Sequence, residues 1–92
     1  MATELPHLIW IDCEMTGLNL ATDALVEIAV LVTDSELNII GEGIDLVIKA
    51  TQSQLDAMGD FVRQMLTASG LITPIPGGIS IEAAQEQILT YL

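Results

Sequence analysis

The stretch LIWIDCEMTGLN, residues 8–19, decides the fold because a continuous apolar run passes directly into acidic residues and then into turn-forming ones. Residues 8–11 are all apolar and directly precede Asp12, Cys13 and Glu14. A short apolar run bounded by turn residues is typical of a buried strand. The pattern therefore predicts an opening strand that ends in a turn near residues 16–19.

Asp12 and Glu14 are separated by one residue on this expected strand. Because side chains alternate along a strand, both carboxylates project from the same face, roughly 7 Å apart along the chain. Cys13 projects from the opposite face and is expected to pack in the core. Two neighbouring carboxylates repel each other unless a cation lies between them, so the pair is a candidate site for metal ions.

Carboxylate oxygens suit hard cations such as Mg²⁺ and Mn²⁺, and two such ions about 4 Å apart can activate water and stabilise the leaving oxygen in phosphodiester cleavage. Each ion wants about six oxygens, so two carboxylates do not complete the site. The alternative is that Asp12 and Glu14 only mark where a buried strand emerges into water. The pair by itself does not separate these two interpretations.

Two further strands are expected at residues 25–33 and 37–48, with turn-forming residues 34–36 between them, which predicts a hairpin. Glu27 lies inside the first of these apolar strands, where a carboxylate costs free energy unless it is paired or hydrated. Glu27 either supports the residues that bind the metal, without contacting the metal itself, or lies at the edge of the buried region and faces water.

The hydrophobic period changes to three and four residues after Thr51, which predicts a helix with Ser53 near its start as a cap. The apolar face of this helix, expected to be mostly core, comprises Leu55, Met58, Phe61, Val62, Met65 and Leu66. Residues 68–78 are rich in Gly, Pro and Ser and predict a loop. A last helix is expected after an N-cap at Ser80, with an apolar stripe formed by Ile81, Ala84, Ile88 and Leu92.

The order of elements, about three mainly antiparallel strands followed by two helices, predicts an α/β fold with an uncovered sheet face and at least one uncovered strand edge. The last helix ends at the apolar Leu92 without a residue that could cap it, which indicates a truncated domain. We therefore interpret residues 1–92 as the N-terminal part of a single domain, and we expect the exposed edge to favour self-association.

Composition excludes several classes of protein. The 13 acidic residues against Lys49 and Arg63 give a formal net charge of −11, so the chain is not a simple electrostatic binder of nucleic acid. The single Cys13 cannot form an internal disulfide or a thiolate metal site. No apolar run reaches the roughly 20 residues that span a membrane, and residues 1–6 lack the pattern of a signal peptide, so a cytoplasmic protein is expected.

Residues 10–18, WIDCEMTGL, resemble the first motif of the oligoribonuclease family, which belongs to the DEDD 3′-5′ exonucleases with a ribonuclease H-like fold. Nine contiguous residues make this signal far more specific than an isolated Asp-x-Glu. The similarity continues at residues 26–29, 32–34, 37–39, 42–43, 55–58 and 69–71.

The resemblance implies a 3′-5′ exoribonuclease that degrades short single-stranded RNA, such as dinucleotides and small oligomers, to mononucleotides by two-metal-ion hydrolysis. It implies that Asp12 and Glu14 are catalytic and bind Mg²⁺ or Mn²⁺, and that Leu18 wedges against the bases of the substrate. It also implies a homodimer in the cytoplasm.

Three departures from the family affect the site. Phe61 stands where the family has Trp, and it can still stack on a base. Leu66 stands where the family has a phosphate-contacting His, and it cannot donate a hydrogen bond. The other two aspartate ligands and the histidine base belong to family motifs that would lie beyond Leu92. His7 precedes the first strand, matches no family position and is expected to be solvated rather than a base.

We therefore expect the chain to be inactive alone, because both a base and half of the metal ligands are missing. The alternative function is a non-catalytic acidic module for binding or dimerisation, derived from the same fold. The intact first motif favours the enzyme, and Leu66 with the missing later motifs favours the module.

Overall fold

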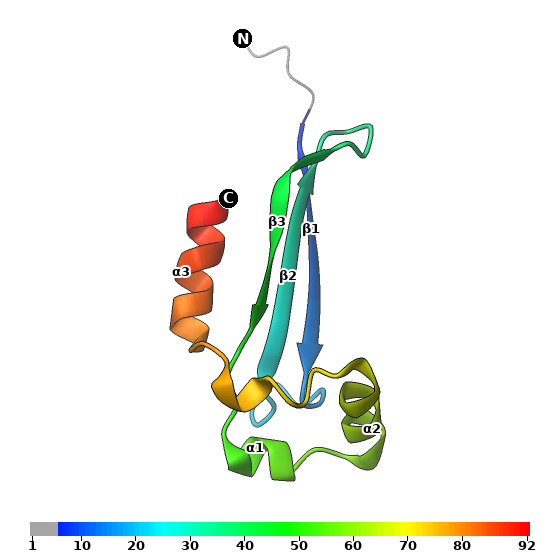
Figure 1. The fold of residues 1–92 in the computed structure, drawn as a ribbon, viewed down its shortest axis with the longest axis vertical. Coiled ribbons are helices and arrows are strands. Elements are labelled where there is room, and N and C mark those ends of the chain that lie inside the picture. The colour runs from blue at the N-terminus through cyan, green and yellow to red at the C-terminus, as the bar shows by residue number, and fades with distance from the viewer. Residues whose placement is uncertain (1–5) are drawn as a thin grey trace.

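A computed structural model describes residues 6–92, and its strands and helices follow the expected α/β order (Figure 1). Three strands come first, β1 (Leu8–Met15), β2 (Leu25–Thr33) and β3 (Ile39–Val47). The helical part follows with α1 (Gln52–Asp56), α2 (Asp60–Ser69), the short 3₁₀ helix η1 (Ile75–Gly77) and α3 (Ile81–Tyr91). The predicted fold class is confirmed.

The three strands form one antiparallel sheet in the order β1-β2-β3. On β1, Glu14 pairs with Glu27 and Met15 pairs with Leu25, so Val26 is an extra residue that forms a bulge in β2. A second irregularity lies opposite Leu31, where Gly41 and Gly43 of β3 have positive φ angles of 77° and 75°. Residues with a Cβ rarely adopt such angles, so glycine suits both positions.

The expected hairpin joins β2 to β3 through a turn at residues 34–38. The Asp34 carboxylate accepts hydrogen bonds from the backbone amides of Glu36 at 2.9 Å and Asn38 at 3.0 Å. The Asn38 side chain also donates to Asp34, and these bonds lower the pKa of Asp34, with a smaller electrostatic contribution from His7. The turn is therefore fixed by one aspartate side chain.

The single helix predicted after Thr51 is instead two helices, because the chain leaves the helical path at residues 57–59. The N-cap of α1 is Thr51, not Ser53. Thr51 and Gln54 form a reciprocal capping box, with Gln54 N donating to Thr51 Oγ1 at 3.1 Å and Thr51 N donating to Gln54 Oε1 at 2.9 Å. Gly70 ends α2 in the left-handed conformation with φ 82°.

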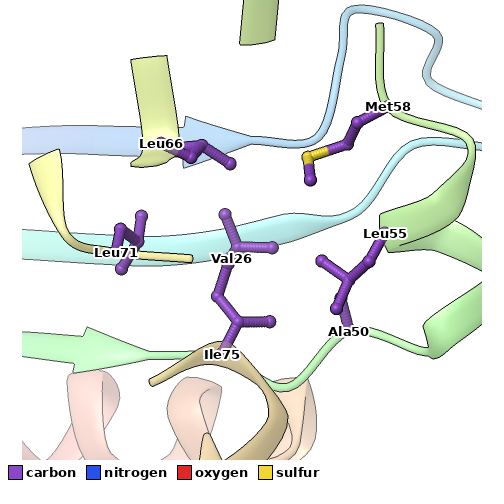
Figure 2. Close-up of a cluster of buried hydrophobic side chains, with 7 residues drawn as sticks. All are labelled: Val26, Ala50, Leu55, Met58, Leu66, Leu71 and Ile75. Atoms are coloured by element: carbon purple, nitrogen blue, oxygen red, sulfur yellow. The ribbon is translucent and has the colours of Figure 1, made fainter. Parts of the chain in front are cut away.

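The main hydrophobic core lies where α1, α2 and η1 meet the end of the sheet, around Val26 from the β2 bulge (Figures 1 and 2). Its other buried members are Ala50, Leu55, Met58, Leu66, Leu71 and Ile75. The prediction that the apolar face after Thr51 is mostly core therefore holds for part of that face. Leu55, Met58 and Leu66 are buried, whereas Phe61 is 80% exposed and Met65 is 42% exposed.

The last helix begins as predicted, with Ser80 as N-cap accepting a hydrogen bond from the Ala83 amide at 3.1 Å. Figure 1 shows α3 running alongside β3. Ala84 is buried against the sheet, and Ile88 with Leu25, Ile28 and Ile48 lines an apolar groove there. The two ends of the predicted stripe, Ile81 and Leu92, are 52% and 53% exposed.

The apolar residues of β1 are not buried as the sequence suggested. Ile9 is 53% exposed, Trp10 49% and Ile11 59%, because within residues 6–92 β1 has only β2 as a neighbouring strand and no helix contacts it extensively. The uncovered sheet edge expected from the order of elements is therefore β1. In the same described part of the chain, no helix has the length and apolarity needed to cross a membrane.

Candidate functional site

The strand register places four carboxylates on one face of the sheet. Asp12 and Glu14 lie two residues apart on β1, and the bulge in β2 lies beyond the Glu14–Glu27 pair. Glu14 pairs directly with Glu27, and Asp12 pairs with Ala29, which in turn pairs with Asp45 of β3. Because directly paired residues share a face, Asp12, Glu14, Glu27 and Asp45 form one acidic face of the sheet.

A hollow of about 450 Å³ lies over part of this face, and Asp12, Ala29 and Asp45 contribute to its lining together with Trp10. The methyl side chain of Ala29 separates the two aspartates, so little material fills the space between them. Asp12 and Asp45 are exposed, whereas Glu14 and Glu27 are half-buried. The acidic face is therefore open to solvent at Asp12 and more enclosed at Glu14.

The negative charges of the acidic face affect the pKa of Glu27, which is raised above its ordinary value of 4.5. Desolvation is the largest cause, followed by a hydrogen bond with the Asp45 side chain and repulsion from Asp45, Glu14 and Asp12. All three other carboxylates therefore act on Glu27. Gathered negative charge of this kind favours a bound proton or a bound cation.

The basic side chains of the described region lie elsewhere. Arg63 donates from Nη2 to the backbone oxygen of Leu55 at 2.6 Å and so links α2 to α1. Lys49 follows β3 and lines a groove with Thr51 and Ser80. His7 is exposed ahead of β1 and acts on Asp34, beside the β2–β3 turn. Residue 7 therefore lies at the other end of β1 from Glu14.

The donor set of the acidic face fits a hard divalent cation in type but not in number. All four side chains offer only carboxylate oxygens, which Mg²⁺ and Mn²⁺ prefer. Within residues 6–92, however, no group of three or more His, Cys, Asp or Glu side chains is arranged to hold a metal ion. The two carboxylates of β1 can supply part of a metal site, and further ligands are required to complete it.

The two residues expected to contact bases are both displayed to solvent. Leu18 lies in the loop between β1 and β2 and is 89% exposed, and Phe61 lies in the first turn of α2. The loop and α2 are at the same end of the sheet, where β1 ends (Figure 1). Leu66, in contrast, is 1% exposed within the core, so its side chain contacts protein and not solvent.

Asp45 was missed by sequence reasoning, although it belongs to the acidic face. It lies within the apolar run of residues 44–48, as Glu27 lies within β2. A carboxylate inside an apolar strand is a signal that could have been noticed, but its partner across the sheet could not. The irregularity at Gly41–Gly43 sets the β2–β3 register, and its size is not readable from hydrophobic alternation.

Comparison with known proteins places the chain in an enzyme class. A family model described as exonuclease, RNase_T, matches residues 9–76, which is most of the chain. The matched segment contains the whole acidic face as well as Leu18 and Phe61. The chain belongs to this exonuclease family.

Particular relatives within the family are oligoribonucleases. The chain is 56% identical to the oligoribonuclease of Streptomyces griseus over 86 residues, which are 94% of the chain and 43% of the relative. It is 56% identical to that of Leifsonia xyli over 92 residues, all of the chain and 44% of the relative. For Mycobacterium avium the identity is 50% over 87 residues, 40% of the relative. The chain thus spans less than half the length of these relatives.

Proposed function

We propose that this chain is the front portion of a 3′-5′ exoribonuclease that degrades short oligoribonucleotides to mononucleotides by two-metal-ion hydrolysis. The observation that carries the proposal is the placement of Asp12 and Glu14 on one open face of β1, inside a segment similar to oligoribonucleases. A cytoplasmic homodimer is part of the proposal, as the resemblance implies.

In this proposal Asp12 and Glu14 bind Mg²⁺ or Mn²⁺, and the bound ions supply the activated water and the stabilisation of negative charge. The carboxylates hold the ions at the end of β1, next to the loop that carries Leu18. Leu18 and Phe61 contact the bases, since both present apolar surface to solvent at that end of the sheet. Hydrolysis needs more ligands and a general base, so the chain alone has negligible activity.

The proposal is tested by replacing the matching segment of the Streptomyces griseus oligoribonuclease with this chain. The chimera is expected to hydrolyse a labelled RNA dinucleotide in the presence of Mn²⁺, and Asp12→Ala is expected to abolish hydrolysis. The isolated chain, assayed in parallel, is expected to give no turnover above background. Asp56→Ala, which removes a carboxylate from α1, serves as the matched control and leaves the chimera active.

A non-catalytic acidic module is the second candidate, and the burial of Leu66 is the observation that favours it. A leucine packed in the core cannot take over the phosphate contact made by the family's histidine. An inactive but folded chimera, alongside an active unmodified relative, would support the module. Robust hydrolysis by the isolated chain, abolished by Asp12→Ala, would instead refute the claim that its catalytic set is incomplete.

A further inference from the structure

The loop between β1 and β2, residues 16–24, is fixed by an internal network of hydrogen bonds. At its base the Thr16 amide donates to Ala24 O at 2.9 Å, and the Ala24 amide donates to Thr16 Oγ1 at 2.9 Å. Thr16 is only 1% exposed although it is polar. A buried hydroxyl must be hydrogen-bonded to avoid a desolvation cost, and here it both donates and accepts.

Asp23 ties together the two ends of the segment that carries Leu18. Its Oδ1 accepts from Thr16 Oγ1 at 3.1 Å, and its Oδ2 accepts from the Asn19 amide at 2.9 Å. Thr16 and Asn19 are the residues immediately outside Gly17–Leu18. One carboxylate is therefore hydrogen-bonded to the Thr16 side chain before Leu18 and to the Asn19 backbone after it.

Gly17 shows how closely the Asp23 carboxylate approaches this segment. A Cβ built at Gly17 would collide with the carboxylate atoms of Asp23. Leu18 is 89% exposed, so the network leaves its side chain without protein cover. Ordering the backbone around an exposed leucine costs conformational entropy that burial of this side chain within the chain does not offset.

We propose that Asp23 is a positioning residue that holds Leu18, through Thr16 and the Asn19 amide, at the place where Leu18 contacts a base of the RNA dinucleotide. The inference rests on the proposed function, because that function supplies the base. Asp23 itself touches no substrate. Its role is to order the loop before binding, so that the dinucleotide does not bear the cost of ordering it.

The test is an NMR titration of the isotope-labelled chain with the dinucleotide pApA in the presence of Mg²⁺, following the Leu18 methyl signals. Asp23→Asn keeps the shape of the side chain but offers one oxygen for two donors. It is expected to weaken binding about tenfold, in line with the loss of a hydrogen bond to a charged group. Hydrogen exchange of the loop amides at residues 18–20 is expected to accelerate in the same variant.

Three further variants separate positioning from general stability. Thr16→Ser keeps the hydroxyl and is expected to bind as the wild type does. Asp34→Asn makes the same change in the β2–β3 turn, at the other end of the sheet, and is expected to leave the affinity unchanged. In a Leu18→Ala background, Asp23→Asn is expected to cause no further loss, because the two residues act as one unit.

Affinity unchanged in Asp23→Asn, or losses in Asp23→Asn and Leu18→Ala that simply add, would overturn the inference while leaving the proposed function intact. Binding detected at the acidic face without any shift of the Leu18 methyls would also overturn it. If the wild-type chain and the chimera both bind no dinucleotide, the proposed function fails and the positioning role fails with it.

Discussion

At the scale of single residues, the acidic face and the core offer different surroundings to side chains from apolar stretches of the sequence. Glu27 and Leu66 both come from apolar stretches of the sequence, but only Leu66 is fully buried. Glu27 remains half-buried beside Glu14 and Asp45, where desolvation and repulsion raise its pKa. The repulsion between these carboxylates therefore acts on the acidic face, where a cation is proposed to bind.

Glu27 gives a prediction about pH. Because folding raises its pKa above 4.5, the folded chain binds the proton more tightly than the unfolded chain does. The folding stability that the tighter proton binding of Glu27 contributes is therefore fully present below its ordinary pKa of 4.5. It falls as the pH rises through the raised pKa that Glu27 has in the folded chain. In the absence of divalent ions, Glu27→Gln is expected to be more stable than the wild type at about pH 8 and equally stable at about pH 4.

Urea unfolding of both proteins at the two pH values checks this expectation. Glu86→Gln on α3 is the control for the change in net charge, and it should shift the midpoint by a smaller amount. A Glu27→Gln variant that gains nothing at the higher pH, or gains more at the lower one, would show that the charge on Glu27 is not unfavourable in the folded chain.

Phe61 and Leu66 give a second prediction, because the sequence assigned both to one apolar face and the structure separates them. Leu66→Ala is expected to destabilise the chain by about 2–5 kcal/mol, since it leaves a cavity in the core. Phe61→Ala is expected to change stability by only about 0.5 kcal/mol. In the chimera, however, Phe61→Ala should weaken dinucleotide binding by about 1–3 kcal/mol through loss of base stacking.

Urea denaturation and dinucleotide binding measure the two effects independently. Equal destabilisation by the two substitutions would contradict the exposed position of Phe61. Unchanged binding in the Phe61→Ala chimera would remove Phe61 from the substrate site.

At the scale of elements, β1 combines part of the acidic face with an unprotected edge. Its backbone pairs on one side only within the described residues, and Ile9 and Ile11 are more than half exposed. Exposed strand edges with apolar side chains favour association with further strands. The net charge of −11 opposes association between copies, and salt screens this repulsion.

We therefore expect the isolated chain to self-associate through β1, more strongly at high salt. Ile11→Lys should reduce association, because a lysine on a strand edge disfavours pairing. Leu89→Lys makes the same change in charge on an exposed residue of α3 and should associate as the wild type does. Sedimentation velocity measures the distribution of species, and a wild type that stays monomeric at high salt and high concentration would be at odds with this account.

At the scale of the whole molecule, the described residues form an elongated body of 52 × 24 × 23 Å with its core at one end. The helices α1, α2 and η1 lie at that end (Figure 1), and α3 packs over the face of the sheet that carries Ile28, away from the acidic face. The loop carrying Leu18, the start of α2 and the end of β1 all meet at the end that contains the core. The end of the sheet that packs against the helices is thus also the end that holds the candidate site.

Much of this arrangement follows from local sequence signals. The opening strand, the Asp34 hairpin and the Ser80 cap each depend on residues that are neighbours in the sequence, so they were predictable. The break between α1 and α2 was not, because apolar spacing at three and four residues continues across Gly59. The capping box of Thr51 and Gln54 was readable as a Thr-x-x-Gln pattern and was overlooked.

Long-range features needed the structure. The packing of Val26, at the bulge of β2, against residues of α1, α2 and η1 depends on contacts between segments that are distant in the sequence. The membership of Asp45 in the acidic face and the link from Asp23 to Thr16 depend on register and loop closure. The exposure of the β1 side chains also escaped prediction, since a continuous apolar run looks the same whether the faces of its strand are covered or not.

Isothermal titration of Mn²⁺ into the isolated chain tests most directly whether Asp12 and Glu14 bind a divalent cation together. The wild type is expected to bind Mn²⁺ weakly, Asp12→Ala to lose this binding, and Asp56→Ala on α1 to retain it. Indistinguishable titrations of the wild type and Asp12→Ala would contradict the assignment of these carboxylates as metal ligands.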